Sequence, residues 1–154
     1  MPSLSLEDNT ILTGTSFGAN KDASGEVVFN TGMVGYPEAL TDPSYRGQIL
    51  VLTYPLVGNY GVCVNSVIAR SEATKQSQSN ILNFPLESEH IQVSGLIVSE
   101  YCKEYSHPSA IQSLGEWLKS EDVPAIEGIN TRALTQKLRE KGTMLGRIEE
   151  LRSK

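Results

Sequence analysis

Short apolar runs separated by turn-forming residues dominate the first third of the chain. Two of these runs predict core strands at Gly25–Asn30 and Gln48–Tyr54, and the second is continuous enough in apolar character to be buried on both faces. Apolar residues also flank Asp8 and Asn9, and this pattern predicts a β-hairpin with a turn at that pair. The hairpin positions are Leu4, Leu6, Ile11 and Leu12. Residues 14–24 lack such a pattern, and we expect them to form a loop.

The second half of the chain alternates between strand and helix patterns. Strands are predicted at Ile91–Tyr101 and Val123–Ile129. Between them, Ser106 is the expected N-cap of a helix, with Pro108 in its first turn. The apolar stripe of that helix would consist of Ala110, Ile111, Leu114, Trp117 and Leu118.

A last helix is predicted to begin at Asn130 or Thr131 and to end before Gly142. A short strand at Met144–Ile148 would follow it, and residues 151–154 would be a tail or linker. Several strands followed by strand, helix, strand, helix favour a mixed α/β domain over a regular βαβ repeat.

The link between the two buried strands is rich in glycine and proline. Tyr36 and the four residues after it predict a short helical turn. At Asp42-Pro43-Ser44, aspartate can cap, proline presets φ, and the Ser44 hydroxyl is expected to point outward. A link that commits so many residues to a special backbone is typical of a specified surface.

Composition narrows the function classes. The chain has 154 residues, a hydrophobic content of 39% and a net charge of -5, which fit one globular domain and argue against general nucleic-acid binding. No apolar run is long enough to span a membrane, and the N-terminus does not resemble a signal peptide, so a cytoplasmic protein is the simple expectation. Residues 63–86 are polar and rich in serine and glutamine, and we expect a flexible segment there.

The sequence gives little support for a catalytic or metal-binding site. The cysteines Cys63 and Cys102 and the histidines His90 and His107 form no recognisable nucleophile–base motif. Packed or incidental cysteines are therefore favoured over a small cysteine hydrolase. Glu87 and Glu89 beside His90, and the pair Glu149-Glu150, are better explained as solvated charges than as a metal site.

Three segments carry a family resemblance. The segments are GEVVFNTGMVGYPEALTDPSYRGQILVLTYPLVGNYG, HIQVSGLIVSEY and SLGEWLKSEDVPAIEGINTRALTQKLREKGTMLGRI. They resemble the N-terminal domain of the small, glutamine-hydrolysing subunit of carbamoyl-phosphate synthase. The amino-acid sequence of these segments is most similar to the form of the domain within the eukaryotic multifunctional pyrimidine-pathway protein. The resemblance covers most of the chain and fails at residues 63–86, so residues 1–150 would be this domain with one atypical segment.

The resemblance implies a layered β/β/α domain of the swivelling type. It also implies a non-catalytic scaffold, which docks a C-terminal glutaminase domain against a large synthetase that uses bicarbonate, ATP and magnesium; no cofactor is expected in this domain. The family nucleophile lies on a Gly-x-Cys-x-Gly motif, which is absent here. From the turn alone, Ser44 is structural or merely exposed, whereas the resemblance makes it a contact for bound glutamine.

Other assignments stay open. A group of polar and aromatic residues would either line a domain–domain surface or shape their own loops: Asn30, Thr31, Gly32, Tyr36, Asn59 and Tyr60. Arg132 opposes the helix dipole and would pair with a carboxylate or contact a partner. An independent binding module is the alternative to the scaffold, and the pathway served, pyrimidine or arginine, is not decided by the sequence.

Overall fold

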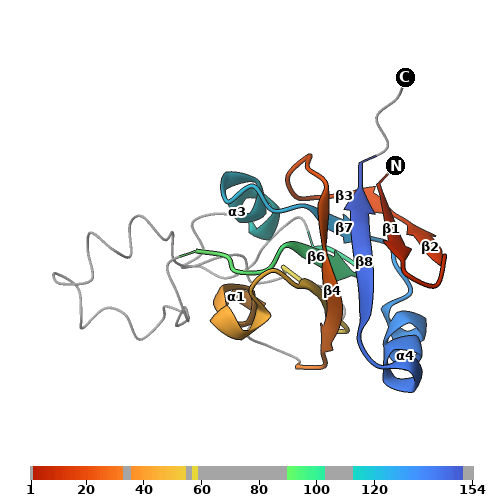
Figure 1. Cartoon of the computed structure of the whole chain (residues 1–154). Helices are drawn as coiled ribbons and strands as arrows, with labels where there is room; N and C mark the ends of the chain where they lie inside the picture. The colour runs from red at the N-terminus through yellow and green to blue at the C-terminus, as the bar shows by residue number, and fades with distance from the viewer. Residues whose placement is uncertain (1, 33–35, 55–56, 59–89, 103–112, 151–154) are drawn as a thin grey trace, which may run out of the picture.

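One eight-stranded mixed sheet forms the centre of the domain (Figure 1). The structure, a computed structural model, describes residues 2–32, 36–54, 57–58, 90–102 and 113–150. The strands are β1 Ser3–Leu6, β2 Ile11–Thr13, β3 Thr15–Ser16, β4 Ala23–Asn30, β5 Ile49–Leu52, β6 Gly95–Val98, β7 Ala125–Glu127 and β8 Met144–Glu149. The helices are α1 Tyr36–Thr41, the 3-10 turn η1 Pro43–Tyr45, α3 Leu114–Ser120 and α4 Thr131–Lys141. The predicted α/β class is confirmed.

The sheet curls until it is nearly closed. Its strand order is β2-β1-β8-β4-β5-β6-β7-β3, with β4, β5, β6 and β7 parallel to one another. The first and last strands in this order, β2 and β3, are joined in the chain by the single residue Gly14. Two edges one residue apart must meet, so the sheet takes the form of an almost complete barrel.

Two apolar clusters lie on the two faces of the sheet. On β5, Leu50 and Leu52 pack with residues of α1 and α3, whereas Ile49 and Val51 belong to a second cluster that includes residues of α4. Helices α1 and α3 accordingly lie on one side of the sheet and α4 on the other (Figure 1). All four β5 side chains are buried, which confirms the strand predicted to be covered on both faces.

The predicted cap and end of the last helix are confirmed. Asn130 is the N-cap of α4, where its side-chain oxygen accepts a hydrogen bond from the Ala133 amide at 3.1 Å. Gly142 ends that helix with φ 77°, a conformation that suits glycine. Strand β8 follows and pairs with both β1 and β4, and its alternating burial pattern shows that one face of the strand is buried.

The structure corrects two predictions. The helix containing Trp117 starts at Leu114 with Ser113 as its N-cap, so Ser106 does not cap it. Ser113 and Glu116 form a reciprocal capping box, a local signal that outweighs the earlier serine. Residues 14–24 are not one loop, because β3 and the start of β4 lie within them. Ser106 and the segment 63–86 lie outside the described residues.

Candidate functional site

The serine singled out in the sequence lies on a turn that side-chain and backbone bonds define. Asp42 Oδ1 accepts a hydrogen bond from the Ser44 amide at 2.9 Å, and the Asp42 carbonyl accepts one from the Tyr45 amide at 3.0 Å. The second bond is the i to i+3 bond of a β-turn, with Pro43 at the position that favours its fixed φ. Ser44 is exposed on this turn, as predicted.

The turn is attached to the body of the domain at both ends. Leu40, in the preceding helix α1, is fully buried, and its carbonyl accepts a hydrogen bond from the Gln92 amide at 2.7 Å. Gln92 in turn accepts a bond from the Gly47 amide at 3.2 Å, just before β5. Gly47 has φ 75°, so glycine relieves the strain of reversing the chain here. The Ser44 turn is thus held by backbone hydrogen bonds on both of its sides.

Tyr45 connects the turn to the end of β4. Its ring packs against the apolar cluster between the sheet and helices α1 and α3, and its hydroxyl accepts a hydrogen bond from Asn30 Nδ2 at 3.3 Å. Asn30 is the last residue of β4 and belongs to the group predicted either to line a surface or to shape its own loop. The structure places it within hydrogen-bond reach of the turn that carries Ser44.

The other members of that group divide. Thr31 and Gly32 are exposed, which is compatible with a contact surface. Tyr36 is 5% exposed within the core, so its ring shapes the interior of the domain. Asn59 and Tyr60 lie outside the described residues. Arg132 is exposed near the start of α4.

Of the candidate cysteines and histidines, the structure describes His90 and Cys102. His90 Nδ1 lies 3.2 Å from Glu121 Oε2, beyond the end of α3, and Cys102 is partly exposed. Cys63, His107, Glu87 and Glu89 lie outside the described residues. Within the part that is described, no three histidine, cysteine or acidic side chains are grouped as metal ligands require.

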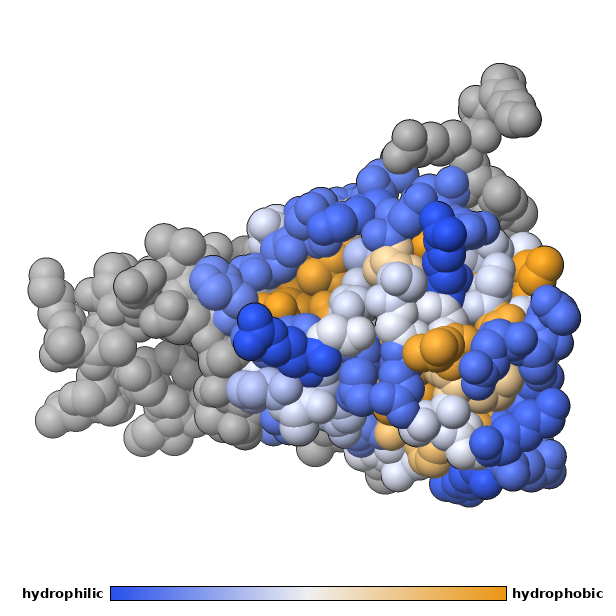
Figure 2. Space-filling model, viewed as in Figure 1, coloured by the Kyte–Doolittle hydropathy of each residue, from blue (hydrophilic) through white to orange (hydrophobic). Residues whose placement is uncertain are grey.

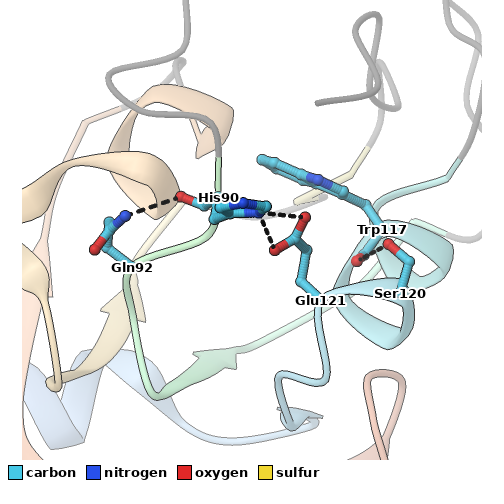
Figure 3. Close-up of polar contacts among 5 residues, drawn as sticks. All are labelled: His90, Gln92, Trp117, Ser120 and Glu121. Carbon is cyan, nitrogen blue, oxygen red and sulfur yellow. Dashed lines mark hydrogen bonds and ion pairs between the residues drawn. The ribbon is translucent and has the colours of Figure 1, made fainter. Parts of the chain in front are cut away.

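The His90 contact ties the segment before β6 to α3. Glu121, at the C-cap of α3, contacts the His90 ring. The Trp117 indole lies on the side of α3 that faces His90 (Figure 3). Trp117 is 1% exposed, and its indole nitrogen has no hydrogen-bond partner in the described structure. The large buried ring supports α3 through packing.

Exposed apolar residues are scattered on the one face of the domain that Figure 2 shows, among the described residues. On the face drawn in Figure 2, hydrophobic residues form separate patches among polar ones. Ile11 and Leu145 are the large apolar side chains that stand most exposed among the described residues, at 65% and 61%. Over the same residues, no helix has the length and apolar character needed to span a membrane. Isolated apolar residues of this kind are ordinary on protein surfaces.

Fold and site together define an α/β domain that presents a shaped, capped turn with an exposed serine. The family profile described as carbamoyl-phosphate synthase small chain, CPSase domain, matches residues 4–148. The chain therefore belongs to the carbamoyl-phosphate synthase small-chain family, as its sequence motifs predict.

Curated relatives agree with this assignment. The chain is 54% identical over 145 residues to the multifunctional protein URA2 of Saccharomyces cerevisiae, covering 94% of this chain and 6% of that protein. It is 52% identical over 143 residues to the carbamoyl phosphate synthase arginine-specific small chain of Neurospora crassa, covering 93% of this chain and 29% of that protein. The chain thus spans less than a third of either relative.

Solved structures add no functional argument. An aminopeptidase from Aneurinibacillus sp. strain AM-1 aligns with a TM-score of 0.46 at 11% identity, covering 97% of this chain and 30% of that one. A likeness of this size carries no inference about this domain.

The contact between Asn30 and Tyr45 is not predicted by the sequence patterns. Its hydrogen bond joins residues 15 positions apart in the chain. The available signal was an asparagine at the end of a buried strand followed by Thr31-Gly32, a pattern typical of a side chain that bonds its own loop. That signal does not reveal the second partner.

Proposed function

We propose that this chain is a non-catalytic scaffold domain of a glutamine-dependent carbamoyl-phosphate synthase. It docks a glutaminase domain against a synthetase, and Ser44 contributes to the glutamine site once the glutaminase domain is in place. Membership of the small-chain family supports the assignment to this enzyme. Relatives that are multifunctional proteins or dedicated small chains support a role within a larger assembly.

The observation that carries the proposal is an exposed serine on a turn fixed at both ends. The Ser44 amide is bonded to Asp42, while the side chain lies at the surface of the domain. A hydroxyl both donates and accepts hydrogen bonds, which suits the carboxylate and ammonium groups of a free amino acid. A contact presented from a rigid neighbour acts by positioning the substrate, and small errors of position are costly in rate.

Chemistry is assigned to the partners. The glutaminase releases ammonia from glutamine, and the synthetase combines it with bicarbonate at the expense of ATP bound with magnesium. In this proposal the described part of the chain supplies shape, a docking face and one hydroxyl. The assembly is expected in the cytoplasm.

The test uses the chain co-purified with the glutaminase domain and the synthetase. Ser44→Ala is expected to raise the KM for glutamine by about tenfold, as loss of a hydrogen bond to a charged group predicts. Activity with ammonium chloride as the nitrogen source should be unchanged, because ammonium bypasses the glutamine site. Equal glutamine KM values for both proteins would refute the contact. Failure of the chain to co-purify would refute the scaffold.

A further inference from the structure

Asn30 forms hydrogen bonds through its side-chain oxygen, its side-chain nitrogen and its backbone carbonyl group. Its Oδ1 accepts a hydrogen bond from the Gly32 amide at 2.7 Å, and its Nδ2 donates to Tyr45 Oη at 3.3 Å. Its carbonyl accepts hydrogen bonds from the Thr53 amide and hydroxyl at 3.3 and 3.4 Å. One residue therefore joins the end of β4, the following loop, the chain after β5 and the η1 turn.

The contact with Tyr45 is the one that reaches Ser44. Tyr45 is next to Ser44 in the chain. Its amide donates a hydrogen bond to the Asp42 carbonyl, and its carbonyl accepts one from the Gln48 amide. Its ring is partly buried against the apolar cluster, so the hydroxyl is the polar end of an otherwise packed side chain. When the hydroxyl is held, the ring and the adjacent turn have one preferred position.

We propose that Asn30 is a positioning residue for Ser44 and acts through the Tyr45 hydroxyl. This inference rests on the proposed function, since it requires Ser44 to contact glutamine. Asn30 itself touches no substrate. Its amide fixes the phenol, the phenol fixes η1, and η1 sets the place from which the Ser44 hydroxyl reaches the neighbouring domain.

Tyr45→Phe is the sharpest variant, because it deletes one oxygen and keeps the packed ring. It is expected to raise the KM for glutamine roughly threefold to tenfold, the range that one neutral hydrogen bond supports. Turnover with ammonium chloride should not change. Asn30→Ala is expected to act in the same direction. Asn30→Asp should retain a near-normal KM, because the carboxylate still accepts from Gly32 and can accept a hydrogen bond from the Tyr45 hydroxyl.

Tyr101→Phe is the matched control. It also deletes a single phenol oxygen, here one that accepts a hydrogen bond from the Gly115 amide at 2.9 Å, at the start of α3. It should cause a similar loss of stability without raising the glutamine KM. If Tyr101→Phe and Tyr45→Phe raise KM equally, the effect is general softening of the domain and the inference is wrong.

A double-mutant cycle of Ser44→Ala and Tyr45→Phe separates the glutamine contact of Ser44 from the positioning role of Asn30. If Tyr45 acts through Ser44, Tyr45→Phe should add nothing to the KM of Ser44→Ala, measured in the co-purified assembly. If Ser44→Ala raises KM but Tyr45→Phe does not, or if the two effects multiply, the positioning role is wrong and the glutamine contact stands. If Ser44→Ala leaves KM unchanged, the contact itself fails, and the positioning role fails with it.

Discussion

Lys137 Nζ lies 2.6 Å from Asp8 Oδ2 and joins two elements that are far apart in the sequence. Asp8 stands in the turn between β1 and β2, and Lys137 projects from α4. The same ammonium group donates to Thr10 Oγ1 at 2.7 Å, and Lys141 reaches Asp8 at 3.5 Å. The hairpin tip is thus fastened to the helix that covers one face of the curled sheet.

This contact predicts a pH-dependent stability. The pKa of Asp8 is held well below its usual range, mainly by the hydrogen bond from Lys137 and next by that of the Thr10 side chain. A depressed pKa stabilises the fold above the unfolded pKa of about 3.9, and that stabilisation is lost as the pH falls from there toward the folded pKa. Asp8→Asn should therefore lower the melting temperature at pH 7 and have a smaller effect near pH 3.

Thermal unfolding of the two proteins across this range provides the measurement. Lys21→Met is a suitable control, because the Lys21–Asp122 pair at 3.0 Å is exposed on both sides and should contribute little at any pH. A difference between wild type and Asp8→Asn that stays constant from pH 7 to pH 3 would contradict the prediction.

Gly14 is predicted to tolerate a side chain poorly. A Cβ atom there would lie 2.2 Å from the Glu127 carbonyl oxygen and 2.6 Å from Ile126 Cγ2, at the point where the two sheet edges meet. Gly14→Ala should destabilise the fold by more than about 3 kcal/mol, because backbone must move to admit the methyl group.

Gly142→Ala is the control for Gly14→Ala. Gly142 has open space around its Cβ position but a backbone at φ 77°, ψ -170°, a region that other residues avoid. The expected loss is about 1–3 kcal/mol, from backbone strain alone. Urea unfolding of both variants measures the difference, and a smaller loss for Gly14→Ala would show that the edges separate easily.

Tyr101→Phe should destabilise the domain modestly. Its ring stacks on Phe17 with centroids 4.2 Å apart, and this stack survives the substitution. The lost hydroxyl leaves the Gly115 amide without that acceptor, at a cost of about 1 kcal/mol. Tyr101→Leu also loses the stack and should cost more. Equal unfolding free energies for the two variants would argue against a contribution from stacking.

Asp42 is predicted to hold the Ser44 turn through its side-chain oxygen. Asp42→Asn keeps an acceptor for the Ser44 amide and should be nearly neutral, whereas Asp42→Ala should cost about 1 kcal/mol. Ser44→Ala should not change stability, because the side chain is exposed. Chemical unfolding compares the three variants, and an Asp42→Asn variant as unstable as Asp42→Ala would mean that the oxygen acceptor is unimportant.

Much of the local structure could be predicted because its causes are close in sequence. The Asp42 turn, the Asn130 cap and the glycine after α4 each involve groups within a few residues of one another. The prediction that Ser106 caps the Trp117 helix is wrong, because Ser113 is the serine spaced three residues before Glu116 and forms the reciprocal capping bonds. The glutamine contact of Ser44 stays a prediction, since it requires a second domain.

By itself, the sequence determined where the main strands lie, where the serine turn lies and to which family the chain belongs, because periodicity, caps and turn residues act over short distances. Only the tertiary structure decided that the sheet closes at Gly14, that Asp8 is fastened to α4, and that Asn30 holds Tyr45 beside Ser44. Those contacts join residues far apart along the chain, and hydrophobic burial brings them together only when the whole sheet has curled.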